Sequence, residues 1–93
     1  MSLSVTRVFD ASAPWQLNDQ VSLRDEAFGA LAYHHGNRRL VFLKSPELVA
    51  LVRGLGEYSS AHEAIDAFVG PAHHERYVAA LSSLFRSELL SGR

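Results

Sequence analysis

The five histidines are the side chains in this sequence best suited to chemistry, either as metal ligands or as acid–base groups. His34 and His35 are adjacent, as are His73 and His74, while His62 stands apart. Neighbouring residues point to opposite faces of a strand and diverge by about 100° on a helix, so neither pair chelates readily through both rings. No His-x-x-x-His or Glu-x-x-His spacing and no cysteine supplies further ligands. We therefore predict no metal site, with the first pair in a hairpin loop and the second pair opening a helix.

The carboxylates, serines and glycines form no catalytic pattern either. Asp25 and Glu26 are neighbours in an expected turn, where a solvated pair is far more common than the shared buried site of an acid–base pair. The Ser59-Ser60 and Ser82-Ser83 pairs lack the flanking pattern of a nucleophile elbow. The glycines do not make a phosphate-binding loop. These features predict a protein that is not an enzyme and needs no cofactor of its own.

Composition narrows the classes of partner. The 93 residues suit one domain, and 47% hydrophobic residues are enough to build a core. The formal net charge of −1 gives no general attraction to nucleic acid or to an anionic membrane. The lack of cysteine is compatible with a reducing cytosol. No apolar run approaches the roughly 20 residues of a membrane span, and the N-terminus does not have the pattern of a signal peptide. We expect a cytoplasmic protein without membrane contacts.

Three strands are expected in the first half of the chain. Val21–Arg24 alternates apolar and polar residues, Phe28–Tyr33 is a second candidate, and Leu40–Leu43 is a short apolar third. Gly29 either weakens the second strand or marks a close approach of another backbone. The segment His34–Arg39 contains Gly36-Asn37, which suits a hairpin loop. Because the connections are short, the strands should form an antiparallel meander.

Three helices are expected in the second half. Ser45-Pro46 provides a capping hydroxyl followed by proline in the first turn, and Ser60–Glu63 is a capping box that opens a second helix. Gly70-Pro71 stops that helix, and the third should run from about residue 72 to residue 90. The expected apolar faces are Leu48, Leu51, Val52 and Leu55; then Ala61, Ala64, Ile65 and Phe68; then Tyr77, Leu81, Leu84, Phe85 and Leu89.

This order of elements predicts an α+β fold, because a three-stranded sheet cannot bury its own apolar face and the helices must cover it. A three-stranded antiparallel sheet followed by three helices, two of them joined by a tight turn, fits a winged helix-turn-helix-like domain. We assign residues 14–90 to this domain and residues 1–13 to an N-terminal arm, which is ordered only if Val8, Phe9 or Trp15 docks on the body.

Winged helices often bind DNA, so a DNA-binding regulator is the main alternative function. A recognition helix should present several basic side chains, yet the third helix has only Arg76 and Arg86 before its end, against Glu75 and Glu88. The second helix has no lysine or arginine. We therefore expect no nucleic-acid partner. A small structural or dimerisation domain without a ligand is a third possibility.

Peptide binding has a mechanical basis in an open sheet, whose edge strand leaves N–H and C=O groups for another chain to pair with. The segment Leu40–Lys44 is expected at such an edge, with the third helix as the other wall of a groove. Residues 24–53 hold an excess of positive charge around the hairpin. These basic residues either belong to an ordinary solvated edge, where they prevent aggregation, or form a basic surface that binds an acidic peptide. For Leu84 and Phe85, core packing is favoured over ligand contact.

Several segments in the sheet region resemble the mycofactocin precursor-peptide chaperone family, which is similar to the peptide chaperones of pyrroloquinoline quinone biosynthesis. The matching segments are Pro14-Trp15-x-Leu17, Val21-x-Leu23-Arg24-x-Glu26-x-Phe28-Gly29-Ala30-Leu31, Tyr33-His34-x-Gly36 and Leu40-x-Phe42-Leu43-Lys44. Leu48, Val52-Arg53, Leu55 and Tyr77-x-x-x-Leu81-x-x-Leu84 fit as well. The resemblance covers about residues 14–90, and the stretch from Phe28 to Lys44 is its specific part.

The resemblance implies a non-catalytic chaperone, a recognition element for ribosomally made and modified peptides. It would bind the leader of an acidic precursor by strand addition beside the third strand and against the third helix. It also implies a second partner, a radical S-adenosylmethionine maturase that modifies the Val-Tyr end of the peptide and carries the cluster itself. On this hypothesis the peptide-binding residues are Arg38, Arg39, Leu40, Val41, Phe42, Leu43, Lys44, Tyr77, Val78, Leu81 and Leu84.

Overall fold

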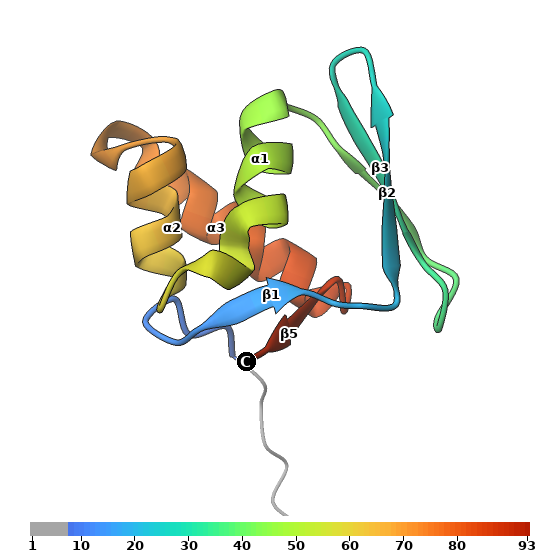
Figure 1. Cartoon of the computed structure of the whole chain (residues 1–93), viewed down its shortest axis with the longest axis horizontal. Coiled ribbons are helices and arrows are strands. Elements are labelled where there is room, and N and C mark those ends of the chain that lie inside the picture. The colour runs from blue at the N-terminus through green and yellow to red at the C-terminus, as the bar shows by residue number, and fades with distance from the viewer. Residues whose placement is uncertain (1–7) are drawn as a thin grey trace, which may run out of the picture.

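A computed structural model describes residues 8–93 as an α+β domain with two small sheets (Figure 1). The strands are β1 (Trp15–Leu17), β2 (Val21–Glu26), β3 (Gly29–His34), β4 (Leu40–Leu43) and β5 (Leu90–Gly92). The helices are α1 (Pro46–Gly54), α2 (Ala61–Phe68) and α3 (His74–Arg86), with 3₁₀ turns η1 (Leu55–Glu57) and η2 (Pro71–His73). The expected class, a three-stranded antiparallel sheet followed by three helices, is confirmed, and the winged helix-turn-helix-like description is compatible with it.

The larger sheet is the predicted meander, with strand order β2-β3-β4 and antiparallel pairing throughout. Ala30 and Ala32 of β3 are fully buried, and their partners on β4 are Leu43 and Val41. Since directly opposed residues share a face of a sheet, these four side chains form the face that packs on the helices. In Figure 1 the sheet lies on one side of α1 and α2 lies on the other, while α3 runs behind α1.

The helix starts follow the predicted caps. The hydroxyl of Ser45 accepts the Leu48 amide at 3.1 Å, and the hydroxyl of Ser60 accepts the Glu63 amide at 3.1 Å. Each bond satisfies one of the amides that an α-helix leaves without a partner in its first turn. The carboxylate of Glu63 accepts a bond from the Ser59 hydroxyl at 2.8 Å.

The third helix is shorter than the sequence predicts, because α3 ends at Arg86 and not near residue 90. Glu88 takes a left-handed conformation with φ of 65°, and the Leu89 amide donates back to the Leu84 carbonyl at 2.9 Å. This left-handed ending stops the helix and turns the chain. Residues 90–92 then form β5, which pairs with β1 in a second, two-stranded sheet that the sequence did not predict.

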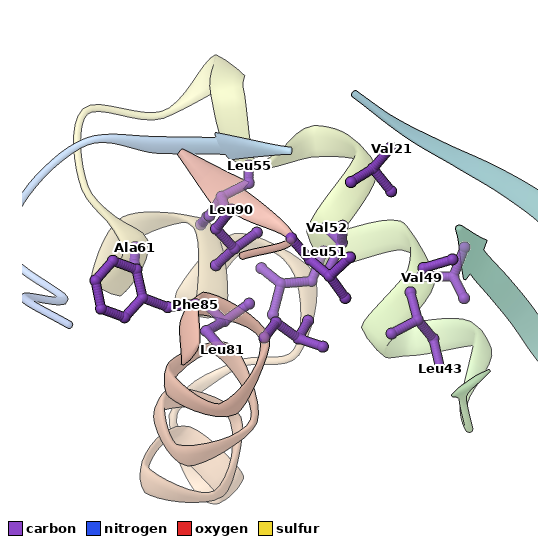
Figure 2. Packing of buried hydrophobic residues seen from close by; sticks show 14 of the residues in the cluster. Val21, Leu43, Val49, Leu51, Val52, Leu55, Ala61, Leu81, Phe85 and Leu90 are labelled. Carbon is purple, nitrogen blue, oxygen red and sulfur yellow. The ribbon is translucent and has the colours of Figure 1, made fainter. Parts of the chain in front are cut away.

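The core is one cluster of buried hydrophobic side chains that come from both sheets and from α1, α2 and α3 (Figure 2). Its fully buried large side chains are Leu43, Leu51, Val52, Leu55, Ile65, Leu81 and Leu89. On the first helix Val49 is buried while Leu48 is only half-buried, so the buried stripe is shifted from the predicted one. Burying large aliphatic side chains of this kind contributes roughly 1.5–3 kcal/mol each before entropy is subtracted.

The described part of the N-terminal arm packs on the body. The Phe9 ring lies 5.1 Å from the Trp15 ring and 5.9 Å from the Phe85 ring, measured between centroids. Ala11 is buried, and its carbonyl accepts the His62 amide at 3.0 Å. Residues 8–13 thus help to hold the start of α2. Residues 1–7 of the arm lie outside the described residues.

Candidate binding site

Strand β4 forms one border of the larger sheet, and within residues 8–93 no strand pairs with its outer side. The amide of His34 donates to the Arg39 carbonyl at 2.9 Å, which fixes where hydrogen-bonded pairs occur along β3 and β4. Such pairs alternate in an antiparallel ladder. With the observed register, Val41 and Leu43 therefore bond toward β3, and the backbone N–H and C=O groups of Leu40 and Phe42 face the open side.

The outward face of this border is apolar. Leu40 and Phe42 lie opposite Tyr33 and Leu31 of β3, on the face away from the helices. The Leu40 side chain is 62% exposed. The Phe28 side chain, also 62% exposed, meets the Phe42 ring edge-on with centroids 5.4 Å apart. The border of β4 therefore has exposed apolar side chains beside its free backbone groups.

A cleft of about 190 Å³ lies where the chain leaves β4 and enters α1, with α3 on its far side. It is lined by Lys44, Ser45, Leu48, Arg76, Tyr77 and Ala80. The Ser45 hydroxyl accepts the Leu48 amide as the cap of α1, and Leu48, Tyr77 and Ala80 supply the apolar part of the lining. Lys44 and Arg76 are both exposed and contribute the positive charge. The cleft can hold an apolar side chain next to a carboxylate.

Four basic side chains lie around the border and form no ion pair with any residue of the described chain: Arg38, Arg39, Lys44 and Arg76. By contrast, Arg24 pairs with Glu26 at 3.1 Å and Arg53 pairs with Asp25 at 2.9 Å. Both of those pairs involve β2, the opposite border of the sheet. The β2 border is thus charge-balanced with carboxylates present, whereas the β4 border is positive.

The loop that carries two of these cations is held by His34. This ring is buried, and its Nδ1 accepts the amides of Gly36 and Asn37 at 2.9 and 3.1 Å. Arg38 follows in a left-handed conformation with φ of 63°, and its amide donates to the His34 carbonyl at 2.8 Å. His34 therefore fixes the hairpin loop and places Arg38 and Arg39 at the start of β4.

The structure divides the predicted binding residues into two groups. Arg38, Arg39, Leu40, Phe42, Lys44 and Tyr77 lie at the border or in the cleft. Leu43, Leu81 and Leu84 are 1%, 0% and 5% exposed, and Val41 and Val78 pack against the core. Leu43, Leu81 and Leu84 therefore expose little surface, whereas Val41 and Val78 are half-buried.

Four residues that line the cleft were not among the predicted binding residues: Ser45, Leu48, Arg76 and Ala80. The sequence places Leu48 on the predicted buried stripe of its helix and marks Arg76 only as a candidate phosphate contact. The spacing of Arg76 and Ala80, four residues apart on one helix, gave a usable signal because such residues share a face. Their position opposite the start of α1 depends on how two helices pack and has no local signature.

The histidines form one contact that the sequence did not predict. The Nδ1 of His62 on α2 lies 2.6 Å from the Nε2 of His74 on α3, and the rings are stacked. The Nδ1 of His74 lies 3.2 Å from an oxygen of Asp66. This chain of contacts links the two helices. Within residues 8–93, no group of three or more histidine, aspartate or glutamate side chains could hold a metal ion.

No helix in the described part of the chain is both long enough and apolar enough to cross a membrane.

Comparison with known proteins gives a consistent result. The model of the peptide chaperone MftB family matches residues 14–91. Among curated proteins, the peptide chaperone MftB of Mycobacterium ulcerans is 42% identical over 83 residues, covering 88% of this chain and 76% of that protein. The same-named proteins of Mycobacterium tuberculosis and Mycolicibacterium smegmatis are 41% and 40% identical, covering 91% and 88% of this chain and 79% and 81% of their own lengths. No solved structure matches the chain.

Proposed function

The chain belongs to the peptide chaperone MftB family, and on that premise we propose that it binds the leader of the mycofactocin precursor peptide by β-strand addition and delivers it to a radical S-adenosylmethionine maturase. Peptide chaperones are non-catalytic, which agrees with the lack of a catalytic pattern in the sequence. The iron–sulfur cluster and S-adenosylmethionine belong to the maturase in this proposal. The chaperone holds the peptide, and the enzyme performs the chemistry in the cytoplasm.

The observation that carries this proposal is the open, positively charged border of β4 next to an apolar cleft. A leader segment in extended form pairs its backbone with the N–H and C=O groups of Leu40 and Phe42. Its side chains then alternate between the cleft side and the outward face of the sheet. Main-chain bonds give general affinity, while the two walls select the sequence.

The β4 border is a better candidate than the β2 border for an acidic leader. Asp25 and Glu26 on β2 would repel carboxylates, and their partners Arg53 and Arg24 are already engaged. On β4 the cations Arg38, Arg39 and Lys44 have no competing partner in the described chain. Charge therefore favours one of the two open borders.

Two single substitutions on neighbouring positions of α3 test the location of the site. Ala80 lines the cleft, whereas Ala79 is exposed and does not line it. In Ala80→Glu a carboxylate enters the cleft and pairs with Lys44 or Arg76, so the affinity for a fluorescently labelled leader should fall by about tenfold or more. Ala79→Glu changes the net charge equally and should leave the affinity unchanged. Equal affinities for both variants, or no binding by the unmodified protein, would reject the proposed site.

Delivery to the enzyme needs a separate experiment. A pull-down with tagged maturase should retain the chaperone and the precursor together, and peptide modification should be slower when the chaperone is replaced by Ala80→Glu. Modification at the same rate with and without the chaperone would refute delivery while leaving peptide binding intact.

A further inference from the structure

The cations of the binding border are found only at its two ends. Arg38 and Arg39 precede β4, Lys44 follows it, and Arg76 faces Lys44 across the cleft. Between these ends the border presents only the apolar residues of β4, Leu40–Leu43. None of the four cations forms an ion pair within residues 8–93. The charge pattern along the strand is positive, apolar, positive.

The space between the two charged ends is short. A paired strand advances about 3.3 Å per residue, so roughly 16 Å separates Arg39 from Lys44 along β4. A ligand strand running alongside covers this distance in about five steps, so about four to five residues lie between the positions that can reach the two ends. A longer stretch between carboxylates would reach only one end at a time.

Both sides of this short segment are apolar. Outward-facing ligand side chains lie beside Leu40 and Phe42, and the Phe28 ring packs edge-on against Phe42. Inward-facing side chains lie toward Leu48 and Tyr77 in the cleft. Successive residues of a strand alternate between these two sides. A ligand strand with one polar face would therefore leave either the outward face or the cleft without an apolar contact. Every residue of the ligand core should then be apolar.

A second copy of this chain is a poor occupant of the border. Two β4 strands paired antiparallel would bring Arg38 and Arg39 of one copy near Lys44 of the other, and like charges facing each other across strands are destabilising. Lysine and arginine at a sheet edge are a known defence against such pairing. The charges thus disfavour pairing between the β4 strands of two copies and favour a chain with carboxylates at matching positions.

We propose that the chaperone recognises a short apolar run of about five residues bracketed at both ends by acidic side chains. This inference rests on the proposed function and specifies its ligand. The acidic side chains at the two ends of this run set which residues of the leader occupy the border, and so they fix the register of the bound leader. Since both ends of the border are positive, charge alone does not set the direction of the bound strand.

A panel of labelled synthetic peptides tests whether binding requires acidic residues at both ends of a short apolar run. The reference peptide has two aspartates, Leu-Val-Leu-Val-Leu and two aspartates. One variant replaces one aspartate pair with asparagines, and another lengthens the apolar run to nine residues. Fluorescence anisotropy should show affinity lower by about tenfold for each variant, because each loses contact with one charged end. Equal affinity across the panel would overturn the proposal.

Charge exchange supplies the matching protein variant. In Arg38→Glu/Arg39→Glu, one end of the border becomes negative, so the reference peptide should bind less tightly. A hybrid peptide with two lysines at one end and two aspartates at the other should restore affinity, and comparing the hybrid that has lysines at its N-terminus with the one that has them at its C-terminus reveals whether one strand direction is preferred. Arg86→Glu, at the end of α3, is the control and should bind the reference peptide normally. Cations that serve only to prevent aggregation would give no loss and no rescue, and that result would also overturn the proposal.

The outcome separates this inference from the function on which it rests. One outcome is that the natural leader perturbs the amide resonances of Leu40 and Phe42 while affinity across the panel is independent of the acidic ends and of the length of the apolar run. In that case only the inference fails. If neither the leader nor the reference peptide perturbs them, both the inference and the proposed function fail.

Discussion

Gly29 at the start of β3 lies so close to Leu43 at the end of β4 that a β-carbon on residue 29 would overlap the Leu43 carbonyl oxygen. The absence of a side chain at this position lets the two backbones approach. The contact lies at the end of β4 from which the chain turns into the cleft. It therefore helps to set the position of the strand that we propose as the peptide-binding border.

Gly29→Ala should lower the free energy of unfolding by about 1–3 kcal/mol, because the backbone of Leu43 must move to make room. Gly56→Ala is the control, since a β-carbon there would meet only the Gln16 side chain at 3.4 Å. Urea denaturation of both variants measures the difference. An unchanged midpoint for Gly29→Ala would mean that the close approach of the strands is not maintained in solution.

His34→Ala should destabilise the domain and also weaken peptide binding. The substitution removes the acceptor of the Gly36 and Asn37 amides, a loss of about 1–3 kcal/mol if these groups find no water. It also frees the loop that carries the two arginines. His35→Ala is the comparison, because that ring is exposed and contacts Ser22 at 2.7 Å. Thermal denaturation and leader titration should both distinguish the two variants, and similar behaviour would contradict this role of His34.

Substitutions of Ser45 should separate stability from binding. Ser45→Ala removes the helix cap and should cost about 1 kcal/mol of stability while changing leader affinity little. Ser45→Asp keeps a cap but places a carboxylate beside Lys44 and Arg76, so stability should be retained and leader affinity should fall. The reverse pattern, with weak binding in Ser45→Ala and normal binding in Ser45→Asp, would show that the hydroxyl contacts the ligand directly.

Leader binding should weaken as salt is raised, since the cations at the border are exposed and are screened over a distance of about 10 Å at 0.1 M salt. Stopped-flow measurements should place most of this effect in the association rate, because long-range attraction accelerates encounter. In Arg38→Gln/Arg39→Gln the salt dependence should be shallower. A salt dependence identical to that of the unmodified protein would show that these two side chains do not steer the ligand.

Most of the fold followed from local patterns in the sequence. The alternation in Val21–Arg24, the loop at Gly36-Asn37 and the caps at Ser45 and Ser60 each report structure within a few residues of themselves. The position of β4 at a border was expected from the short connections of the meander and is confirmed by the strand order. Of the two alternatives that the sequence leaves open for Gly29, the structure shows the close approach of another backbone.

The rest depends on contacts between distant parts of the chain. Strand β1 pairs Trp15 with Gly92, and neither three-residue strand has enough alternation to be detected alone. The end of α3 was missed because its left-handed residue is Glu88, where glycine or asparagine is usual. For the site, the border could be predicted, but the cleft depends on the placement of α1 against α3, which brings Leu48 opposite Tyr77.

Amide hydrogen exchange at β4 tests strand addition most directly. In the free protein the amides of Leu40 and Phe42 face the open border and should exchange quickly, while those of Val41 and Leu43 bond toward β3 and should exchange slowly. On addition of the leader, we predict strong new protection at Leu40 and Phe42 and little change at Val41 and Leu43. Saturation with leader that leaves Leu40 and Phe42 unprotected would contradict binding by strand addition to β4.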